Sequence, residues 1–274
     1  MSTSEISGTT RLFGVIADPI THVRACEVFN PRFRERGIDA VLVPLHVGAA
    51  GLARALDGFR TLANLGGVLV TIPHKEAILE LVDEVGPQAT RVGAGNVFRR
   101  TADGRLEAEN FDGLGFVGGL AAAGHRPAGK TVLLVGAGGA GKAIAYALAE
   151  AGARRLIVAN RAQARAEALA AGVRTAFPTC EAVPGPADPE GVDLIVNATS
   201  LGLRADDPLP VDPAAAAPGT VVAEIVMKPE RTPLVAAAAA RGLTVHLGRH
   251  MLDHQVPLLA RFIGAFDDAA QAAT

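Results

Sequence analysis

Short apolar runs alternate with amphipathic stretches along almost the whole chain. In its first part this pattern predicts strands at 12–17, 40–45 and 68–72 and helices at 26–36, 49–59 and 74–82. Strands that alternate with helices form parallel sheets with helices packed on their faces. The pattern therefore predicts an α/β fold.

A hairpin is predicted next, because two runs of alternating polarity flank the turn 101–104, which contains an Asp-Gly pair. A helical run at 113–123 then leads to a second unit, with strands predicted near 131–136, 155–159, 192–197, 221–226 and 244–247. The proline-rich stretches 183–189 and 208–218 are predicted as loops, and a last helix over about 251–272. The sequence leaves open whether that helix packs on the first unit.

The stretch TVLLVGAGGAGKA at 131–143 joins a buried strand directly to the pattern Gly136-x-Gly138-x-x-Gly141. The first glycine permits a tight turn, the second lets the backbone approach a pyrophosphate, and the third allows close packing of helix on strand. The following helix would point its N-terminus at the anion. These features predict a dinucleotide site, and a glycine-rich turn that binds nothing is the alternative.

The residues after the next strand indicate which nicotinamide dinucleotide is favoured. An acidic residue there would hydrogen-bond the ribose 2′-hydroxyl and repel a 2′-phosphate. The strand at 155–159 leads instead into Asn160 and Arg161, with Arg165 one helical turn further on. Because a guanidinium suits a phosphate, NADP is predicted. NAD is the alternative, if Arg161 and Arg165 only face solvent.

Composition narrows the classes of partner. The 274 residues are 49% hydrophobic and 20% charged, with a net charge of −2, one tyrosine and no tryptophan. A chain without a basic stripe or stacking aromatic residues is a poor match for nucleic acid. Cys26 and Cys180 show no metal-ligand spacing, and the chain shows neither a signal-peptide pattern nor an apolar run of membrane-spanning length. We therefore expect a cytoplasmic protein.

Two residues combine the properties needed to move a proton. Lys75 follows the strand-ending sequence VTIPH, and Asp112 directly follows the hairpin in NFDG. Ligands of α/β folds bind at the carboxyl ends of strands, where an amine and a carboxylate in contact could together take a proton from an alcohol. A helix-start lysine and an N-cap aspartate with purely structural roles are the alternative.

Ordered motifs over nearly the whole chain resemble those of the shikimate and quinate dehydrogenase family. They are GVIADPITH at 14–22, VTIPHK at 70–75, AGNVF at 94–98, ENFDG at 109–113, GAGGAGKA at 136–143, Asn160-Arg161, NATSLGL at 197–203, EIVMKPERTPLV at 224–235 and GRHMLDHQ at 248–255. The resemblance implies two α/β domains with a cleft between them. A substrate domain would span 1–112, completed by the helix 250–274, and a Rossmann-type NAD(P)-binding domain would span 113–249.

The same resemblance implies roles for individual residues. Lys75 and Asp112 would form the catalytic pair. The substrate would contact Thr71, Asn96 and Gln255, and the cofactor Gly136, Ala137, Gly138, Gly139, Ala140, Gly141, Asn160, Arg161, Arg165, Thr199 and Gly248. The implied reaction is the reversible NADP-dependent reduction of 3-dehydroshikimate, or of a close cyclic hydroxy-acid analogue, to the alcohol.

The chain departs from the family pattern where the substrate carboxylate is bound. Val23 and Ala25 stand where the family has two serines, so two hydrogen-bond donors are missing. Arg24, between them, could grip a carboxylate bidentately or point to solvent. Three other usually polar positions are also apolar: Val97, Phe111 and Met227. A best substrate other than shikimate is therefore an open alternative.

Further alternatives concern the class of protein. VTIPHK and ENFDG together argue against a methylene-tetrahydrofolate or amino-acid dehydrogenase on the same architecture. A quinate or shikimate dehydrogenase that uses NAD, and a non-catalytic NADP sensor, remain. His250 and His254 lie one helical turn apart but lack the glutamate of a zinc-protease helix, so no metal is expected. We expect a monomer or homodimer that binds a small cyclic hydroxy acid, and neither nucleic acid nor a membrane.

Overall fold

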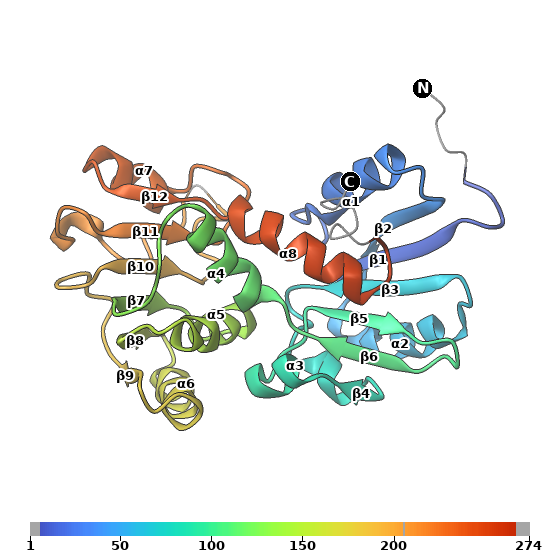
Figure 1. Ribbon diagram of the computed structural model, residues 1–274, viewed down its shortest axis with the longest axis horizontal. Helices are drawn as coiled ribbons and strands as arrows, with labels where there is room; N and C mark the ends of the chain where they lie inside the picture. Colours follow the sequence, from blue (N-terminus) through green and yellow to red (C-terminus); the bar gives the residue numbers. More distant parts are fainter. Residues whose placement is uncertain (1–5, 205, 267–274) are drawn as a thin grey trace. The chain divides into compact units, whose positions relative to one another are not determined.

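Two six-stranded sheets organise the chain (Figure 1). The computed structural model describes residues 6–204 and 206–266. The chain forms two units, one comprising the residues up to 111 together with those from 256 on, and the other residues 112–255. The division into a substrate domain, 1–112 with 250–274, and a cofactor domain, 113–249, stays a prediction. Each unit combines a sheet with helices, so the predicted α/β class is confirmed.

The first unit begins with three parallel strands. Its elements are β1 (Arg11–Ala17), α1 (Ala25–Glu35), β2 (Ala40–His46), η1 (Ala49–Gly51), α2 (Leu52–Thr61), β3 (Leu65–Val70), η2 (Ala77–Glu80), β4 (Glu84–Val85), α3 (Pro87–Val92), β5 (Val97–Arg100) and β6 (Leu106–Glu109). In the sheet order β2-β1-β3-β5-β6-β4, the strands β1, β2 and β3 are parallel, whereas β5 runs antiparallel to β3 and β6. The predicted hairpin is thus confirmed, and β1, β2 and β3 end at one edge.

Alternation along β1 sends its side chains to two faces of this sheet. One face carries an aromatic cluster whose neighbouring ring centroids lie 5.6 to 6.2 Å apart: Phe13, Phe29, Phe33 and Phe266. The other face carries an aliphatic core that includes Ile16, Leu56 and Val68. Each fully buried side chain of this size contributes about 1.5–3 kcal/mol. Apolar packing on both faces therefore anchors the loops at the carboxyl edge.

The second unit is a parallel sheet throughout. Its elements are α4 (Asp112–Ala122), β7 (Thr131–Val135), α5 (Gly139–Glu150), β8 (Arg155–Ala159), α6 (Gln163–Ala176), β9 (Glu181–Pro184), β10 (Leu194–Asn197), η3 (Pro213–Ala215), β11 (Val221–Glu224), α7 (Pro233–Ala240), β12 (Thr244–His246) and the start of α8 (Arg249–Phe262). The strand order β12-β11-β10-β7-β8-β9 is that of a Rossmann fold. Ligands of such folds bind where the strand order reverses, here between β7 and β10.

In the first unit, one local prediction is wrong and one helix was not predicted. The helix predicted at 74–82 is only the short turn η2, Ala77–Glu80. His74 is 1% exposed, and its Nε2 lies 2.6 Å from the carbonyl oxygen of Val47, so a buried tertiary contact sets the path of this segment. The helix α3 was not predicted, although Pro87 at its start and Gly93 with φ of 68° at its end are usual boundary residues.

Two further differences concern an edge strand of the second unit and the end of the last helix. The edge strand β9 occupies the beginning of the predicted loop 183–189 and ends on Pro184, which an edge strand tolerates because one side of it needs no ladder partner. The last helix ends at Phe262 rather than near residue 272, and Gly264 follows with φ of 66°. The remainder of that prediction, from residue 267, lies outside the described residues. Within the described ranges, none of the helices has the length and apolar character to cross a bilayer.

Two partly exposed histidines surround the buried His246 in the second unit. His246 is 2% exposed, and its ring centroid lies 4.8 Å from that of His250 and 6.1 Å from that of His125. Its Nε2 has no hydrogen-bond partner within residues 6–204 and 206–266. Burial, followed by the charges of His250, His125 and His254, lowers the pKa of His246 from 6.5 to about 4.

This lowered pKa predicts acid sensitivity. Below pH 6.5 the unfolded chain binds a proton that folded His246 excludes until about pH 4. Stability is therefore lost as the pH falls through this window, by on the order of 2 kcal/mol. His246→Phe removes the titrating ring and is expected to flatten the pH dependence, as measured by urea unfolding between pH 7.5 and 4.5. His46→Gln, at an exposed position, is the control, and equal slopes for wild type and His246→Phe would contradict the prediction.

Candidate active site

The glycine-rich turn between β7 and α5 has the geometry that its sequence predicts. Gly136 has φ of 113°, and a Cβ there would lie 2.8 Å from the backbone of Ala198. A Cβ on Gly141 would collide with the carbonyl oxygen of Gly136. By contrast, a Cβ on Gly138 would have no atom of the described chain within 4 Å. The turning and packing roles of the first and third glycines are confirmed, while the approach of a pyrophosphate to Gly138 stays a prediction.

Alanine at Gly138 tests this open space. The backbone there, with φ of −85° and ψ of −174°, suits any residue, so Gly138→Ala is expected to fold normally. Its methyl group would occupy the space where a pyrophosphate approaches the helix N-terminus, and NADPH is expected to bind at least about tenfold more weakly. Fluorescence titration and thermal unfolding measure the two effects. Gly141→Ala should instead lower the Tm, and wild-type affinity of Gly138→Ala would contradict the assignment.

The end of β8 carries the residues predicted to select the cofactor. The Asn160 side chain accepts a hydrogen bond from Ala137 N at 3.1 Å and donates one to Ala162 O at 2.9 Å, which ties this segment to the glycine-rich turn. Arg161 and Arg165 are exposed, and within the described ranges neither guanidinium takes part in an ion pair. Two cations without an acidic partner could each meet a phosphate, so the fit to NADP is favourable.

A buried polar network joins β10 to β11, next to the reversal of strand order between β7 and β10. Asn197 is fully buried and Glu224 is 1% exposed. Asn197 Nδ2 donates to both Glu224 carboxylate oxygens, at 2.9 and 3.0 Å, and Asn197 Oδ1 accepts bonds from Thr199 N and Oγ1 at 3.1 and 2.7 Å. Burial raises the pKa of Glu224, although the surrounding hydrogen bonds lower it.

Asn197 and Glu224 are not among the predicted site residues. A polar residue that ends an apolar strand, as in LIVN and VVAE, is the signal that could have identified them. Gly248 lies against the loop that follows Glu224, because a Cβ on Gly248 would be 2.8 Å from the backbone of Ile225. Thr199 and Gly248 thus both lie in loops at the carboxyl ends of this sheet.

In the first unit, three predicted residues gather around the end of β3. Thr71 N donates to Ile16 O at 3.1 Å, Asn96 O accepts from Val70 N at 2.7 Å, and Lys75 O accepts from Gly95 N at 2.7 Å. Asn96 is 4% exposed, and its Oδ1 accepts a hydrogen bond from Phe111 N at 3.0 Å. The backbone of adjacent strands therefore brings Thr71, Lys75 and Asn96 together, as residues at the carboxyl edge of a sheet should be.

Asp112 and Gln255 form a second group. Both belong to the second unit, where Asp112 begins α4 and Gln255 lies on α8. Gln255 Nε2 donates to Asp112 Oδ1 at 2.7 Å, and the two residues are only 3% and 7% exposed. A buried amide thus orients the carboxylate. Lys75 belongs to the first unit, and its pairing with Asp112 stays a prediction.

The segment before α1 holds the departures from the family pattern. Arg24 Nε donates to Glu27 Oε2 at 2.8 Å, so its guanidinium already has an acidic partner. Ala25 is 7% exposed and Val23 is half-buried. His22 Nε2 is buried with no hydrogen-bond partner in the described part of the chain. The structure thus has the Arg24 side chain partly exposed and paired with Glu27, while its binding of a substrate carboxylate stays a prediction.

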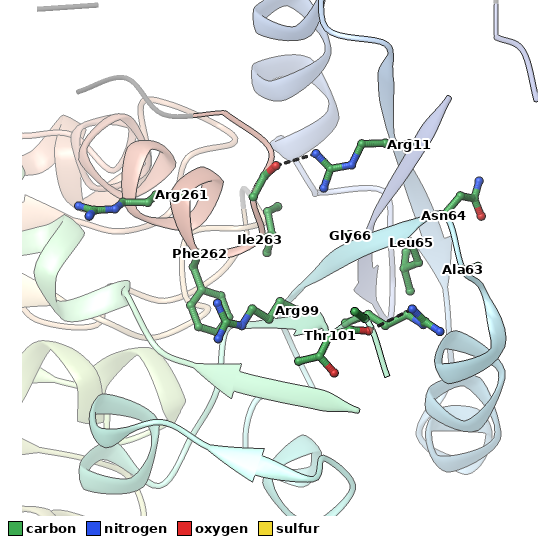
Figure 2. A pocket seen from close by; sticks show the side chains of 13 residues that line it. Arg11, Ala63, Asn64, Leu65, Gly66, Arg99, Thr101, Arg261, Phe262 and Ile263 are labelled. Carbon is green, nitrogen blue, oxygen red and sulfur yellow. Dashed lines mark hydrogen bonds between the residues drawn. The ribbon is translucent and has the colours of Figure 1, made fainter. Parts of the chain in front are cut away.

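A cavity of about 400 Å³ lies at the opposite edge of the first sheet, where β1 and β3 begin (Figure 2). Arg11 Nη1 donates to Gly264 O at 2.8 Å, and the Arg99 guanidinium lies 5.1 Å from the centre of the Phe262 ring. Figure 2 shows Arg261 pointing away from Arg11 and Arg99. Arg11 and Arg99 thus join the end of α8 to the sheet. None of the predicted site residues lines this cavity.

A metal centre is not indicated by the side chains. Within residues 6–204 and 206–266, no three histidine, cysteine, aspartate or glutamate side chains are grouped so that they could hold a metal ion. His254 Nδ1 lies 2.9 Å from the carbonyl oxygen of His250, a contact within one helix. The predicted site residues at the carboxyl edges of the two sheets offer an amine, a carboxylate, amides and guanidinium groups.

Comparison with known proteins assigns both halves of the chain. Residues 15–98 match the shikimate dehydrogenase substrate binding domain, and residues 121–200 match the shikimate/quinate 5-dehydrogenase family. A shikimate dehydrogenase (NADP(+)) from Acidiphilium cryptum is 42% identical over 270 residues, which cover 96% of this chain and 95% of that protein.

Solved structures agree. The shikimate 5-dehydrogenase of Thermus thermophilus, in complex with NADP(H) and shikimate, is 31% identical with a TM-score of 0.82, and the match covers 94% of each chain. A ligand-free 5-ketofructose reductase of Gluconobacter sp. strain CHM43 is also 31% identical, with a TM-score of 0.83 and 96% of each chain covered. Together with the fold and the ordered motifs, these similarities show that the chain belongs to the shikimate and quinate dehydrogenase family.

Proposed function

We propose that this chain is an NADP-dependent dehydrogenase that reversibly reduces 3-dehydroshikimate, or a close cyclic hydroxy-acid analogue, to the alcohol. The observation that carries the proposal is the agreement between both family matches and the Rossmann order of the second sheet, with its glycine-rich turn at the reversal. The retained Lys75, Asp112, Asn96 and Gln255 favour an active enzyme over a non-catalytic NADP sensor, which has no need of a proton-transfer pair.

The cofactor fits the residues present. The open space at Gly138 and the N-terminus of α5 suit a pyrophosphate, and the exposed guanidinium groups of Arg161 and Arg165 suit a 2′-phosphate. When bound, the nicotinamide supplies or accepts a hydride at the substrate carbon. Thr199 and Gly248, in loops at the same edge, are proposed to contact the cofactor as well.

The residues at the two carboxyl edges are proposed to handle the substrate and its proton. Lys75 takes the hydroxyl proton as the alcohol becomes a ketone and returns it in the reverse direction. Asp112, whose carboxylate accepts a hydrogen bond from Gln255 at 2.7 Å, assists Lys75 in this proton transfer. Thr71, Asn96 and Gln255 bind the ring hydroxyl groups.

Initial rates test the proposal directly. Cofactor reduction is measured with shikimate and with quinate, each against NADP and NAD, at several substrate concentrations. Saturable turnover of shikimate with NADP supports the proposal. Saturation with NAD alone would favour the quinate or NAD-dependent alternative, and tight NADP binding without turnover of either acid would overturn the assigned substrate.

A second candidate substrate is a related ketone without a carboxylate. Val23 and Ala25 cannot donate side-chain hydrogen bonds, and the Arg24 guanidinium is held by Glu27 at 2.8 Å. Replacing donors to a charged group costs about 1.5–3 kcal/mol for each lost hydrogen bond. One similar solved structure is a 5-ketofructose reductase, so 5-ketofructose, a neutral ketose, should be tested in the same assay. A higher kcat/KM for the ketose than for 3-dehydroshikimate would establish this candidate.

We propose that the enzyme acts in the cytoplasm, because Cys26 and Cys180 are both free thiols, as is usual in a reducing compartment. We propose a monomer or homodimer, which analytical ultracentrifugation would distinguish.

A further inference from the structure

Glu224 is a buried carboxylate surrounded by donors. It lies on β11 directly beside Asn197 on β10, its partner in the parallel register. Asn197 Nδ2 donates to both of its oxygens, Val226 N donates to Oε1 at 2.9 Å, and Thr232 Oγ1 donates to Oε2 at 2.9 Å. An ionised carboxylate, which only accepts hydrogen bonds, satisfies all of these partners at once.

This arrangement decides which way the Asn197 amide faces. With its nitrogen turned toward Glu224 and also donating to Leu201 O at 3.0 Å, the amide must present Oδ1 on its other side. There Oδ1 accepts hydrogen bonds from both the backbone and the hydroxyl group of Thr199. The reversed amide would face Glu224 with an acceptor and the Thr199 N–H with a donor, so both of these hydrogen bonds would be lost.

Thr199 in turn lies against the glycine-rich turn. Its Cγ2 is 3.0 Å from the position of a Cβ on Gly136, so the loop after β10 packs directly on the first glycine of the motif. β7 and β10 are the neighbouring strands at which the order of the sheet reverses. A small rotation of Thr199 would therefore reach the place where folds of this type hold a dinucleotide.

We infer that Glu224 is a positioning residue of the dinucleotide site: through the Asn197 amide, it fixes Thr199 against the glycine-rich turn. The inference rests on the proposed function, since it takes the site to bind NADP. Glu224 is 1% exposed and acts through Asn197 rather than on the ligand. The exchange of a carboxylate for an amide in this pair should consequently weaken cofactor binding without altering substrate affinity.

Glu224→Gln is the first test. Because Asn197 Nδ2 contacts both carboxylate oxygens, the new amide nitrogen meets a donor in either orientation, and the strain is relieved by turning Asn197. The Kd for NADPH, measured by fluorescence titration, is expected to rise about fivefold or more, which is of the order of one hydrogen bond. The amide of Thr199 should exchange hydrogen faster in the cofactor-free protein, while the KM for the substrate is unchanged.

The reciprocal variant gives a sharper test. Asn197→Asp places two carboxylates in contact and should weaken NADPH binding most. In the double variant N197D/E224Q the polarity of the pair is exchanged, so that the side chain on β11 donates and the one on β10 again accepts from Thr199. Partial recovery of NADPH affinity relative to N197D supports the inference. A double variant that folds but binds no better than N197D overturns it.

Thr232→Val is the matched control. It removes one donor to the same carboxylate and the N-cap of α7, but no contact of Asn197. The Tm is expected to fall while the Kd for NADPH changes by less than about twofold, since the amide keeps its orientation. An equal loss of affinity in Thr232→Val and Glu224→Gln would show that Glu224 acts only through stability, and would overturn the inference.

The outcomes separate this inference from the proposed function. If the wild-type protein does not bind NADPH, the proposed function fails, and unchanged hydrogen exchange at Thr199 in Glu224→Gln would also overturn the positioning role. If the wild type binds NADPH and Glu224→Gln binds equally well, only the inference fails. If Glu224→Gln does not fold, the comparison of N197D with the double variant decides.

Discussion

Replacing Lys75 by alanine is expected to lower kcat by about 10²-fold or more, with little change in the substrate KM. A positioned general acid or base contributes about 10²–10⁴-fold to the rate, and alanine supplies no group to take the hydroxyl proton. Lys75 is half-buried in the first unit, so the variant should fold. Steady-state kinetics at saturating NADP measure the effect.

Lys130→Ala provides a control for the loss of a lysine. Lys130 is 51% exposed, and its Nζ lies 3.4 Å from Asp193 in the second unit. Its replacement should leave kcat unchanged. A Lys75→Ala enzyme that turns over at the wild-type rate would remove Lys75 from the mechanism, whereas a large rise in KM at constant kcat would make it a binding residue.

The second large effect is expected at Arg161. Arg161→Ala should weaken NADP binding about 10- to 100-fold and leave NAD binding nearly unchanged, because charge-assisted hydrogen bonds are worth about 1.5–3 kcal/mol. The reason is that only NADP carries the 2′-phosphate that an arginine at the end of β8 would meet. Titration of the two cofactors at equal ionic strength measures the ratio of their Kd values.

Arg241→Ala controls for the loss of a positive charge from the same unit. Arg241 is exposed at the end of α7, just before β12 begins, and therefore lies at the opposite edge of the sheet from the glycine-rich turn. The preference for NADP should persist in this variant. An unchanged ratio of the Kd values for NADP and NAD in Arg161→Ala would contradict the role of Arg161. Selection of NADP would then depend on Arg165 or on neither arginine.

Regular local patterns in the sequence were sufficient to predict most strands and helices of the fold. Buried strands such as 131–135 are continuous apolar runs, and the hairpin of β5 and β6 is predicted by its Asp-Gly turn. The prediction of a helix at 74–82 was wrong, because the contact of His74 with Val47 joins residues 27 apart in the sequence. The periodicity of apolar residues contains no information on such a contact.

For the site, the glycine-rich turn could be predicted from the sequence because each glycine answers a local requirement of backbone conformation or close packing. The importance of Asn197 and Glu224 could not be predicted from the sequence, since each is an isolated polar residue at the end of an apolar run. Their pairing follows from the register of β10 on β11, and register depends on the whole sheet.

The sequence by itself thus determined the α/β class, the dinucleotide motif and the resemblance to the family, because these depend on short-range patterns and on the order of motifs. Only the tertiary structure decided that the Arg24 guanidinium is held by Glu27, that Gln255 orients Asp112, and that a buried carboxylate orients the amide beside the glycine-rich turn. These are contacts of single side chains, and their partners are chosen by packing and by the need to satisfy buried polar groups.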